Sequence, residues 1–245
     1  MEVPNKKQKT FLDLSVFDLV RSKTITLSNI FKIYPALTEL NLMYNLIKNE
    51  EIILLLDFLK NNKTLTSLNL NHNWIENNGA IALANFLKSN KILTSLELVG
   101  TGIKDDGIIA LAKSLKDNST LTKLDLNQNP FTNDGMIALA NALKSNSSLT
   151  SLKLKFNVIK NAGISTFIET LFLNSTLTSL VLDSQNDTID FLIAQNKYIT
   201  KIRNNSIFYA ILAIKRYSKL DKYIIQMIIG KIRQNIGDKA WLMIE

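Results

Sequence analysis

Residues 120–147 read TLTKLDLNQNPFTNDGMIALANALKSNS, and this stretch decides the fold. Its first half carries regularly spaced leucines, and its second half carries apolar residues at the spacing of one helix face. The phrase returns with a period of 28 residues, and successive copies begin at Ala36, Thr64, Ile92, Thr120, Ser148 and Thr176. One such unit cannot bury its own apolar edge, so neighbouring units must stack.

The first half of each repeat predicts a short strand followed by a turn. It reads L-x-x-L-x-L, and the last two leucines alternate with exposed positions. Three residues later comes an asparagine whose side chain is expected to bond backbone groups at the turn: Asn45, Asn73, Asn129 or Asn157. Thr101 and Gln185 take this place in two other repeats, where we expect weaker turns.

The second half predicts a helix. A glycine precedes it at Gly79, Gly107, Gly135 and Gly163. The apolar residues that follow form one helical face. The expected helix ends at a repeated asparagine, a residue that tolerates the left-handed conformation of many helix ends: Asn62, Asn90, Asn118, Asn146 and Asn174.

Stacking of such units predicts a curved solenoid. Neighbouring strands lie about 4.8 Å apart, whereas packed helices need about 8–10 Å. The helix side must therefore be the longer one. We expect an α/β horseshoe with a parallel sheet on its concave face and helices on its convex face.

The pattern L-x-x-L-x-L-x-x-N-x-I-x-x-x-G, followed by a helix and repeated every 28 residues, resembles the ribonuclease-inhibitor-type leucine-rich repeat over residues 36–182. The resemblance implies a horseshoe that binds other proteins through its concave face and adjoining loops. The asparagine-, lysine- and isoleucine-heavy composition, with a tail outside the repeat pattern, is similar to leucine-rich-repeat effectors of intracellular bacteria. That similarity implies delivery into a host cell cytosol.

The ends of the chain depart from the repeat. Residues 1–35 fit a degenerate first repeat and N-terminal cap, with Phe17 and Ser22 replacing the asparagine and the glycine. Residues 36–197 form the repeat array. Residues 198–245 are expected to hold one irregular strand, starting near Ile199 and Ile202, and a helical C-terminal cap over the last repeat.

Composition and charge narrow the possible environments. The 245-residue chain has no cysteine, which excludes disulfides and thiolate metal sites and favours a reducing, cytoplasmic setting. No apolar run is long enough to span a membrane. We also expect the protein to be a monomer. The net charge of +8 lies at the ends, because residues 36–197 sum to −1 while residues 198–245 sum to +6. A neutral array does not predict a nucleic-acid groove.

No set of residues in the sequence predicts catalysis, a cofactor or a metal site. His72 is the sole histidine, and a metal site there would lack further histidine or cysteine ligands. A catalytic triad would need His72 as its base, but no serine lies in an activating turn such as G-x-S-x-G. Asp105 and Asp106 directly precede Gly107. We interpret them as negative charges that stabilise the dipole at a helix start, in preference to a paired acid site. We therefore expect a protein that is not an enzyme.

Candidate binding residues lie on the outward strand positions and just beyond the strands. The strand positions include Glu39, Asn69, Glu97, Lys123, Asp125, Lys153 and Lys155. The larger side chains that follow the strands are Tyr44, His72, Trp74 and Phe156. Trp74 either serves as an exposed binding residue or lies flat on the next turn as packing. Tyr44, His72 and Trp74 are expected to lie side by side at the edge of the sheet.

Three functions remain open at this point. The leading one is a protein-binding module that holds a partner on its concave face and strand-end loops and so inhibits or masks that partner. The second is a membrane-surface adaptor that uses the basic C-terminal region on anionic lipid. The third is a substrate-recruiting subunit, in which residues 198–245 dock a second protein.

Overall fold

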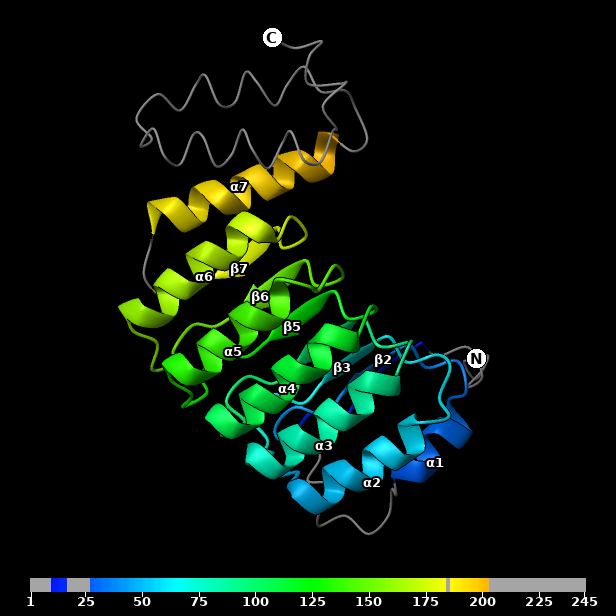
Figure 1. Cartoon of the computed structure of the whole chain (residues 1–245). Coiled ribbons are helices and arrows are strands. Elements are labelled where there is room, and N and C mark those ends of the chain that lie inside the picture. Colours follow the sequence, from blue (N-terminus) through cyan, green and yellow to red (C-terminus); the bar gives the residue numbers. More distant parts are fainter. Residues whose placement is uncertain (1–9, 17–26, 184–185, 203–245) are drawn as a thin grey trace.

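Strands and helices alternate through the whole described part of the protein (Figure 1). The structure is a computed structural model that describes residues 10–16, 27–183 and 186–202. The strands are β1 (Phe11–Asp13), β2 (Glu39–Asn41), β3 (Ser67–Asn69), β4 (Ser95–Glu97), β5 (Lys123–Asp125), β6 (Ser151–Lys153) and β7 (Ser179–Val181). The helices are α1 (Leu27–Ile33), α2 (Asn49–Leu59), α3 (Glu76–Ser89), α4 (Asp105–Asp117), α5 (Asn133–Leu143), α6 (Asn161–Leu173) and α7 (Asp187–Ile202).

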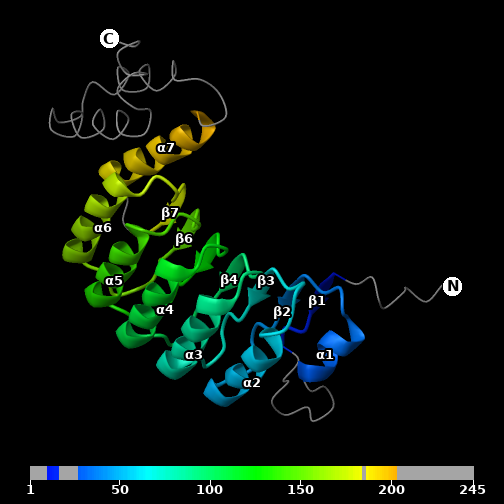
Figure 2. The same ribbon diagram turned by 45° about the vertical axis from the view of Figure 1, so that its right-hand side comes forward.

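The seven strands form one parallel sheet in chain order, from β1 to β7. Each pair is offset by one repeat, so Leu40 pairs with Leu68, Leu96 pairs with Leu124, and the other strands follow the same register. The stack curves with its strands on the inner side and its helices on the outer side (Figure 2). The α/β leucine-rich-repeat horseshoe predicted from the sequence is therefore confirmed.

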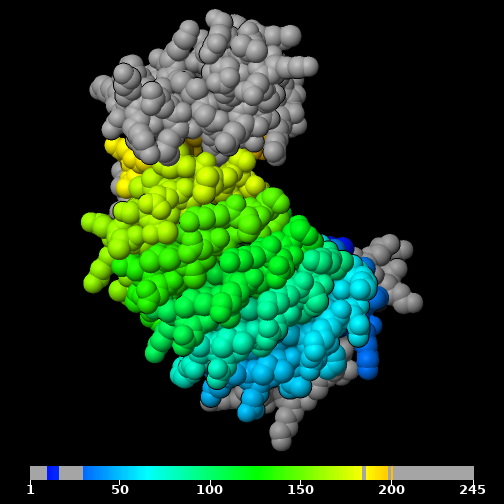
Figure 3. Space-filling model, viewed as in Figure 1, coloured from blue at the N-terminus to red at the C-terminus, as the bar shows by residue number. Residues whose placement is uncertain are grey.

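A single core runs the length of the stack between the sheet and the helices. The strand leucines, the first helical leucines and larger side chains such as Phe131 and Phe167 are fully buried there. Each repeat covers the apolar edge of its neighbour, so the repeats appear as bands across the molecule (Figure 3). Burial of each leucine contributes about 1.5–3 kcal/mol, which makes the continuous core the main source of stability.

The turn asparagines bond backbone groups at the turn, as the sequence predicts, and they also join neighbouring repeats. The buried Asn73 accepts hydrogen bonds at Oδ1 from the backbone N–H groups of Asn45 and Ile47, both at 3.0 Å. Its Nδ2 donates to the carbonyl oxygens of Leu42 and Leu70, both at 2.9 Å. One amide thus satisfies backbone groups in two successive repeats, at the point where the chain leaves the sheet.

Thr101 makes a smaller set of bonds in the same position. Its hydroxyl lies 2.8 Å from the carbonyl oxygen of Leu98, within its own repeat. Among the described residues, its side chain makes no bond to the preceding repeat. We expect Thr101→Asn to form the bonds to the preceding repeat that the turn asparagines make elsewhere. The free energy of unfolding should rise by about 1 kcal/mol. Urea denaturation of both proteins measures the difference, and an unchanged or lower midpoint would contradict the weak-turn interpretation.

None of the helix-end asparagines is left-handed, so that part of the prediction is wrong, and Asn90, Asn118 and Asn174 are extended. Asn118, for example, has φ −83° and ψ 125°. Its Oδ1 instead accepts the backbone N–H groups of Thr120 and Leu121 at 3.0 and 2.8 Å. Its Nδ2 donates to the carbonyl oxygen of Leu87 in the preceding repeat at 2.8 Å. The side chain closes the helix end, so the backbone needs no left-handed turn.

A third polar series at the helix starts was not predicted: Asn49, Asn77, Asp105 and Asn133. Asp105 Oδ1 accepts the backbone N–H groups of Thr132 and Gly135, both at 2.8 Å, in the following repeat. The sequence interpretation placed Asp105 beside the dipole of its own helix, but its carboxylate also binds the start of the next one. Gly135 allows this close approach, because a Cβ there would lie 2.9 Å from Asp105 Oδ1.

The first strand continues the sheet at the N-terminal end. Leu12 of β1 pairs with Leu40 and is buried, as the repeat period predicts. In the first helix Ile30 occupies the core position, while Phe31 is only partly buried. Phe17 and Ser22 lie outside the described residues, so the boundary of this cap stays a prediction.

Leu12→Asp tests the contribution of β1 to the core. A buried carboxylate has no partner at this position, and the terminal strand can detach to expose it. We therefore expect a loss of about 2–3 kcal/mol in the free energy of unfolding. Phe11→Asp is the matched control, since Phe11 lies on the same strand and is 48% exposed. Thermal melting of both variants is the measurement, and equal melting temperatures would show that β1 does not support the core.

The irregular last strand near Ile199 and Ile202 is not observed, and this prediction is wrong. Both residues lie in α7. Ile189, Leu192 and Ile193 are buried at helical spacing and place this helix over the last repeat. Asn196 Nδ2 donates to the carbonyl oxygens of Asn174 and Leu177, and these bonds join α7 to the last repeat. The predicted C-terminal cap beyond residue 202 lies outside the described residues.

Candidate protein-binding surface

The turns at the ends of the strands hold a left-handed residue at the same position of six successive repeats. These residues have φ between 54° and 62°, recur every 28 positions and are Val16, Tyr44, His72, Gly100, Gln128 and Phe156. We name Tyr44, His72, Gly100, Gln128 and Phe156 the strand-end row. Left-handed backbone costs a side-chain-bearing residue about 1–2 kcal/mol, so the neighbouring turns must hold it. The backbone N–H of His72, for instance, donates to the carbonyl oxygen of Val99 at 2.7 Å.

Tyr44 and His72 form a stacked pair within this row. Their ring centroids lie 4.4 Å apart, and the planes differ by 5°. The far side of the imidazole approaches Gly100, where a Cβ would lie 2.7 Å from His72 Nδ1. The glycine therefore leaves room for a flat aromatic surface made by two adjacent repeats.

Gly100→Ala is expected to displace the His72 ring from Tyr44 and to cost about 1–2 kcal/mol of stability, because alanine is strained at this φ. The Tyr44 ring signals in NMR spectra report the displacement. Gly102→Ala is the matched control: its φ is 75°, but the nearest atom to its Cβ, Glu76 Cγ, lies 3.6 Å away. Unchanged Tyr44 ring signals in Gly100→Ala would show that the stack does not depend on this glycine.

Trp74 belongs to a second series, two residues further along each repeat. We name it the outer row: Leu46, Trp74, Gly102, Pro130 and Val158. Trp74 is 58% exposed, so more than half of the residue is open to solvent. Lys48 Nζ lies 5.8 Å from its ring centroid, within the range of a cation–π contact. The structure thus pairs Tyr44 with His72 and pairs Trp74 with Lys48.

Phe156 and Val158 make a second apolar group three repeats away from His72 and Trp74. They are exposed, as are Tyr44, Leu46 and Trp74 at the other end. At a strand spacing of about 4.8 Å, three repeats separate the two groups by about 14 Å along the sheet. Exposed apolar side chains therefore occupy both ends of the same edge.

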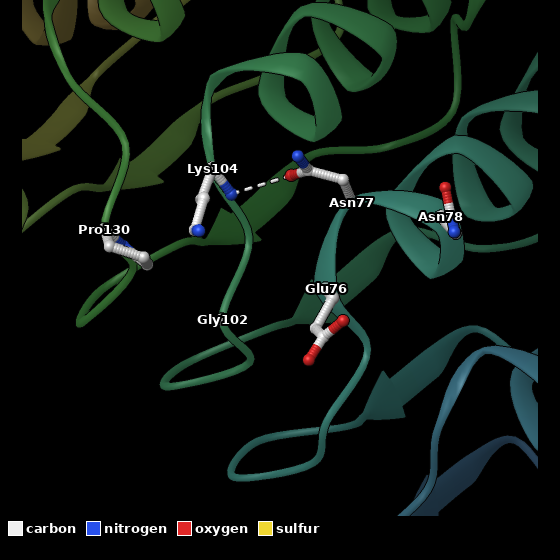
Figure 4. A pocket seen from close by; sticks show the side chains of 6 residues that line it. All are labelled: Glu76, Asn77, Asn78, Gly102, Lys104 and Pro130. Carbon is white, nitrogen blue, oxygen red and sulfur yellow. Dashed lines mark hydrogen bonds between the residues drawn. The ribbon is translucent and has the colours of Figure 1, made fainter.

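A polar hollow lies between these two apolar groups. Gly102 lines it without a side chain (Figure 4). The space measures approximately 530 Å³. The other lining residues are Glu76, Asn77, Asn78, Lys104 and Pro130. Asn77 Oδ1 is already engaged with the backbone N–H of Lys104 at 2.9 Å. The exposed Glu76 carboxylate and Lys104 ammonium are the charged groups of this hollow.

Most candidate residues on the concave strands bond within the protein. Asn69 and Asp125 accept the backbone N–H groups two residues ahead, at 2.9 and 3.1 Å. Asp125 is buried and pairs with Lys153 at 2.9 Å, and this hydrogen bond raises the pKa of Lys153. Glu97 accepts a bond from Asn71 Nδ2 at 2.8 Å. These four side chains support the concave surface.

Three other candidates have side chains that make none of these internal bonds and are exposed or partly exposed to solvent. Glu39 and Lys123 are exposed on the strands. Lys155 is partly buried, and its backbone N–H donates to Asn127 Oδ1 at 2.7 Å. The concave face thus adds a few separate charges beside the apolar edge.

The described residues hold no group of three or more histidine, cysteine or acidic side chains that could bind a metal ion. Within the same residues, no helix is long and apolar enough to cross a membrane.

Comparisons with known proteins point to the same architecture. Residues 71–156 match the TMOD/LMOD leucine-rich domain family. A structure of leiomodin-1 actin-binding site 2 superposes with a TM-score of 0.57 at 25% identity, covering 61% of this chain and 91% of that chain. The tropomodulin C-terminal domain of Caenorhabditis elegans superposes with a TM-score of 0.54 at 15% identity, covering 64% of this chain and 97% of that chain. A search of curated protein sequences found no significant match.

The chain is therefore a leucine-rich-repeat protein, and these likenesses support a module that binds other proteins. The matched segment runs from Asn71 to Phe156. It contains His72, Trp74, the polar hollow and Phe156.

Proposed function

We propose that the protein is a non-enzymatic binding module that holds a partner protein along the C-terminal edge of its sheet. The observation that carries this proposal is the placement of exposed large apolar side chains on that edge: Tyr44, Leu46, Trp74, Phe156 and Val158. Exposed aromatic side chains of this kind supply much of the binding energy at protein interfaces.

The arrangement of the edge sets the shape of the partner surface. Two apolar groups about 14 Å apart favour a partner with two apolar contacts at that distance. The hollow between them accepts a protruding polar or charged segment, which can bond the Glu76 carboxylate or the Lys104 ammonium. The exposed Glu39 and Lys123 add charges at the rim, where they affect the association rate more than the affinity. A partner seated on this edge and the adjoining concave face is masked over an area typical of standard protein interfaces.

Actin is the first partner to test. The leiomodin-1 structure similar to this chain is an actin-binding site. Three repeats of this chain, with Trp74 and Phe156 in them, match the leucine-rich domain family of that protein. Actin therefore serves as a defined protein probe for the proposed edge.

Titration of fluorescently labelled monomeric actin with the full chain tests this function. Fluorescence anisotropy is expected to rise to saturation, and Trp74→Ala should weaken the binding. Ile81→Ala is the control, because Ile81 is 39% exposed on α3, on the helical side of the same repeat. No rise at any concentration would exclude actin. Binding that both variants preserve would place the contact away from this edge.

We extend this proposal in two ways: the protein inhibits its partner, and it is delivered into a host cell cytosol. Occlusion of a functional surface on the partner follows if that surface is the one seated on the edge. The alternatives that use the basic region rest on residues 198–245, most of which lie outside the described residues.

A further inference from the structure

Four of the five helix-end asparagines stand in the acceptor sequence for N-linked glycosylation, Asn-x-Ser/Thr: Asn62, Asn118, Asn146 and Asn174. Asn90 is the exception, because Ile92 follows it at the third position. A glycosylation acceptor ordinarily marks a surface loop. Here the same asparagines are the side chains that close each helix and join it to the preceding repeat.

Three of these four acceptors are buried with their amide nitrogens already engaged. Asn118, Asn146 and Asn174 are each between 3% and 4% exposed. Asn146 Nδ2 donates to the carbonyl oxygens of Leu115 and Asn118 at 2.7 and 3.1 Å. Asn174 Nδ2 donates in the same way to Leu143 and Asn146, at 2.7 and 3.0 Å. Both amide hydrogens therefore point into the protein.

Glycosyl transfer acts on the same atom. It forms a bond from Nδ2 to the anomeric carbon of the sugar, breaks the bond from that carbon to a lipid diphosphate carrier, and releases one amide proton. A hydrophilic oligosaccharide on Asn146 Nδ2 would replace one of the two cross-repeat hydrogen bonds. It would also need a volume that the neighbouring repeat fills. The modified side chain cannot occupy the folded position.

We propose that folding of this chain and N-linked glycosylation of its helix-end asparagines exclude each other. The transfer enzyme meets the chain while it is still unfolded and the asparagines are accessible. Once glycosylated, the chain loses the bonds that join repeat to repeat at Asn118, Asn146 and Asn174. The protein therefore folds only in a compartment that has no glycosyl transfer to asparagine, whichever partner it binds there.

Translation of the full chain with an added cleavable signal peptide, in the presence of endoplasmic-reticulum microsomes, tests the proposal. The lumenal product is expected to carry glycosidase-sensitive mass shifts at the helix-end asparagines and to be digested about tenfold faster by protease. The same chain translated without microsomes should be unmodified and protease-resistant. Peptide mass spectrometry identifies the modified asparagines.

A matched variant separates the glycans from other effects of the lumen. Thr64→Ala, Thr120→Ala, Ser148→Ala and Thr176→Ala together remove the four acceptor sequences but keep every asparagine. This variant must first prove resistant without microsomes, and it should then stay resistant inside them. Asn186 and Asn204, in further Asn-Asp-Thr and Asn-Asn-Ser acceptors outside the series, remain available as internal controls for transfer. A resistant lumenal wild type, with or without glycans on Asn118, Asn146 and Asn174, would overturn the proposal. Equal sensitivity of the variant inside microsomes would overturn it as well.

Discussion

Asn129→Ala is expected to lower the free energy of unfolding by about 3–5 kcal/mol, because it leaves several buried backbone groups without a partner. Asn129 Oδ1 accepts the N–H groups of Thr101 and Ile103 at 3.2 and 3.0 Å. Its Nδ2 donates to the carbonyl oxygen of Leu98 at 2.8 Å. All three groups belong to the preceding repeat, and alanine can bond none of them. Urea denaturation followed by circular dichroism measures the loss.

Asn141→Ala is the matched control for this substitution. Asn141 lies on α5 in the same repeat and is exposed, so its removal should change the stability by less than about 0.5 kcal/mol. A loss of less than 1 kcal/mol in Asn129→Ala, comparable to the control, would contradict the cross-repeat role of the asparagines.

Trp74→Ala is expected to weaken partner binding by about 2 kcal/mol, which corresponds to roughly a 30-fold rise in Kd. Trp74 is 58% exposed and belongs to the apolar group that also includes the exposed Tyr44 and Leu46. Because its ring contributes little to the core, the melting temperature should stay within about 2 °C of the wild type. Isothermal titration calorimetry with the partner protein measures the change in affinity, and thermal melting measures the change in stability.

Ile81→Ala serves as the control for exposed apolar area in the same repeat, and it should leave both quantities unchanged. A Trp74→Ala protein that unfolds would show that the indole is packing. Unchanged affinity would move the site along the array, to the surface near Lys123, Lys153, Lys155 and Phe156.

Sequence reasoning predicted the fold well because the repeat fixes it many times over. Leu12, Leu40 and their successors occupy one register position in every strand, so a local error at one repeat does not change the architecture. The prediction was wrong where the period breaks. Ile199 and Ile202 follow the last full repeat, and their spacing suits a strand or a helix. The helix is indicated only by Ile189, Leu192 and Ile193, which are buried at helical spacing earlier in the same segment.

The polar series were predicted only in part. The turn asparagines follow a conspicuous strand pattern, so Asn73 and Asn129 could be placed correctly. Asn118 was assigned to a left-handed helix end because propensity alone says nothing of a side chain that bonds the preceding repeat. Asp105 and its equivalents at 28-residue intervals offered a periodic signal that could have revealed the helix-start bonds.

The candidate surface shows a similar division between what the sequence predicts and what it does not. The period places Tyr44, His72 and Trp74 on one edge, but it does not determine ring orientation. The stack of Tyr44 on His72 depends on the left-handed backbone and on the space left at Gly100. The hollow beside Glu76 depends on Gly102, which has no side chain to fill it. The sequence does not predict this space, because its other walls come from the neighbouring repeats.

Site-specific photo-crosslinking tests most directly whether a partner protein sits on the proposed edge. A photoreactive phenylalanine analogue is placed at Trp74, at Phe156 or at Ile81 in the full chain, and each protein is irradiated with bound actin. Our account predicts crosslinks from positions 74 and 156 and none from position 81. Crosslinks from position 81, with none from the other two, would contradict it and assign binding to the helical face.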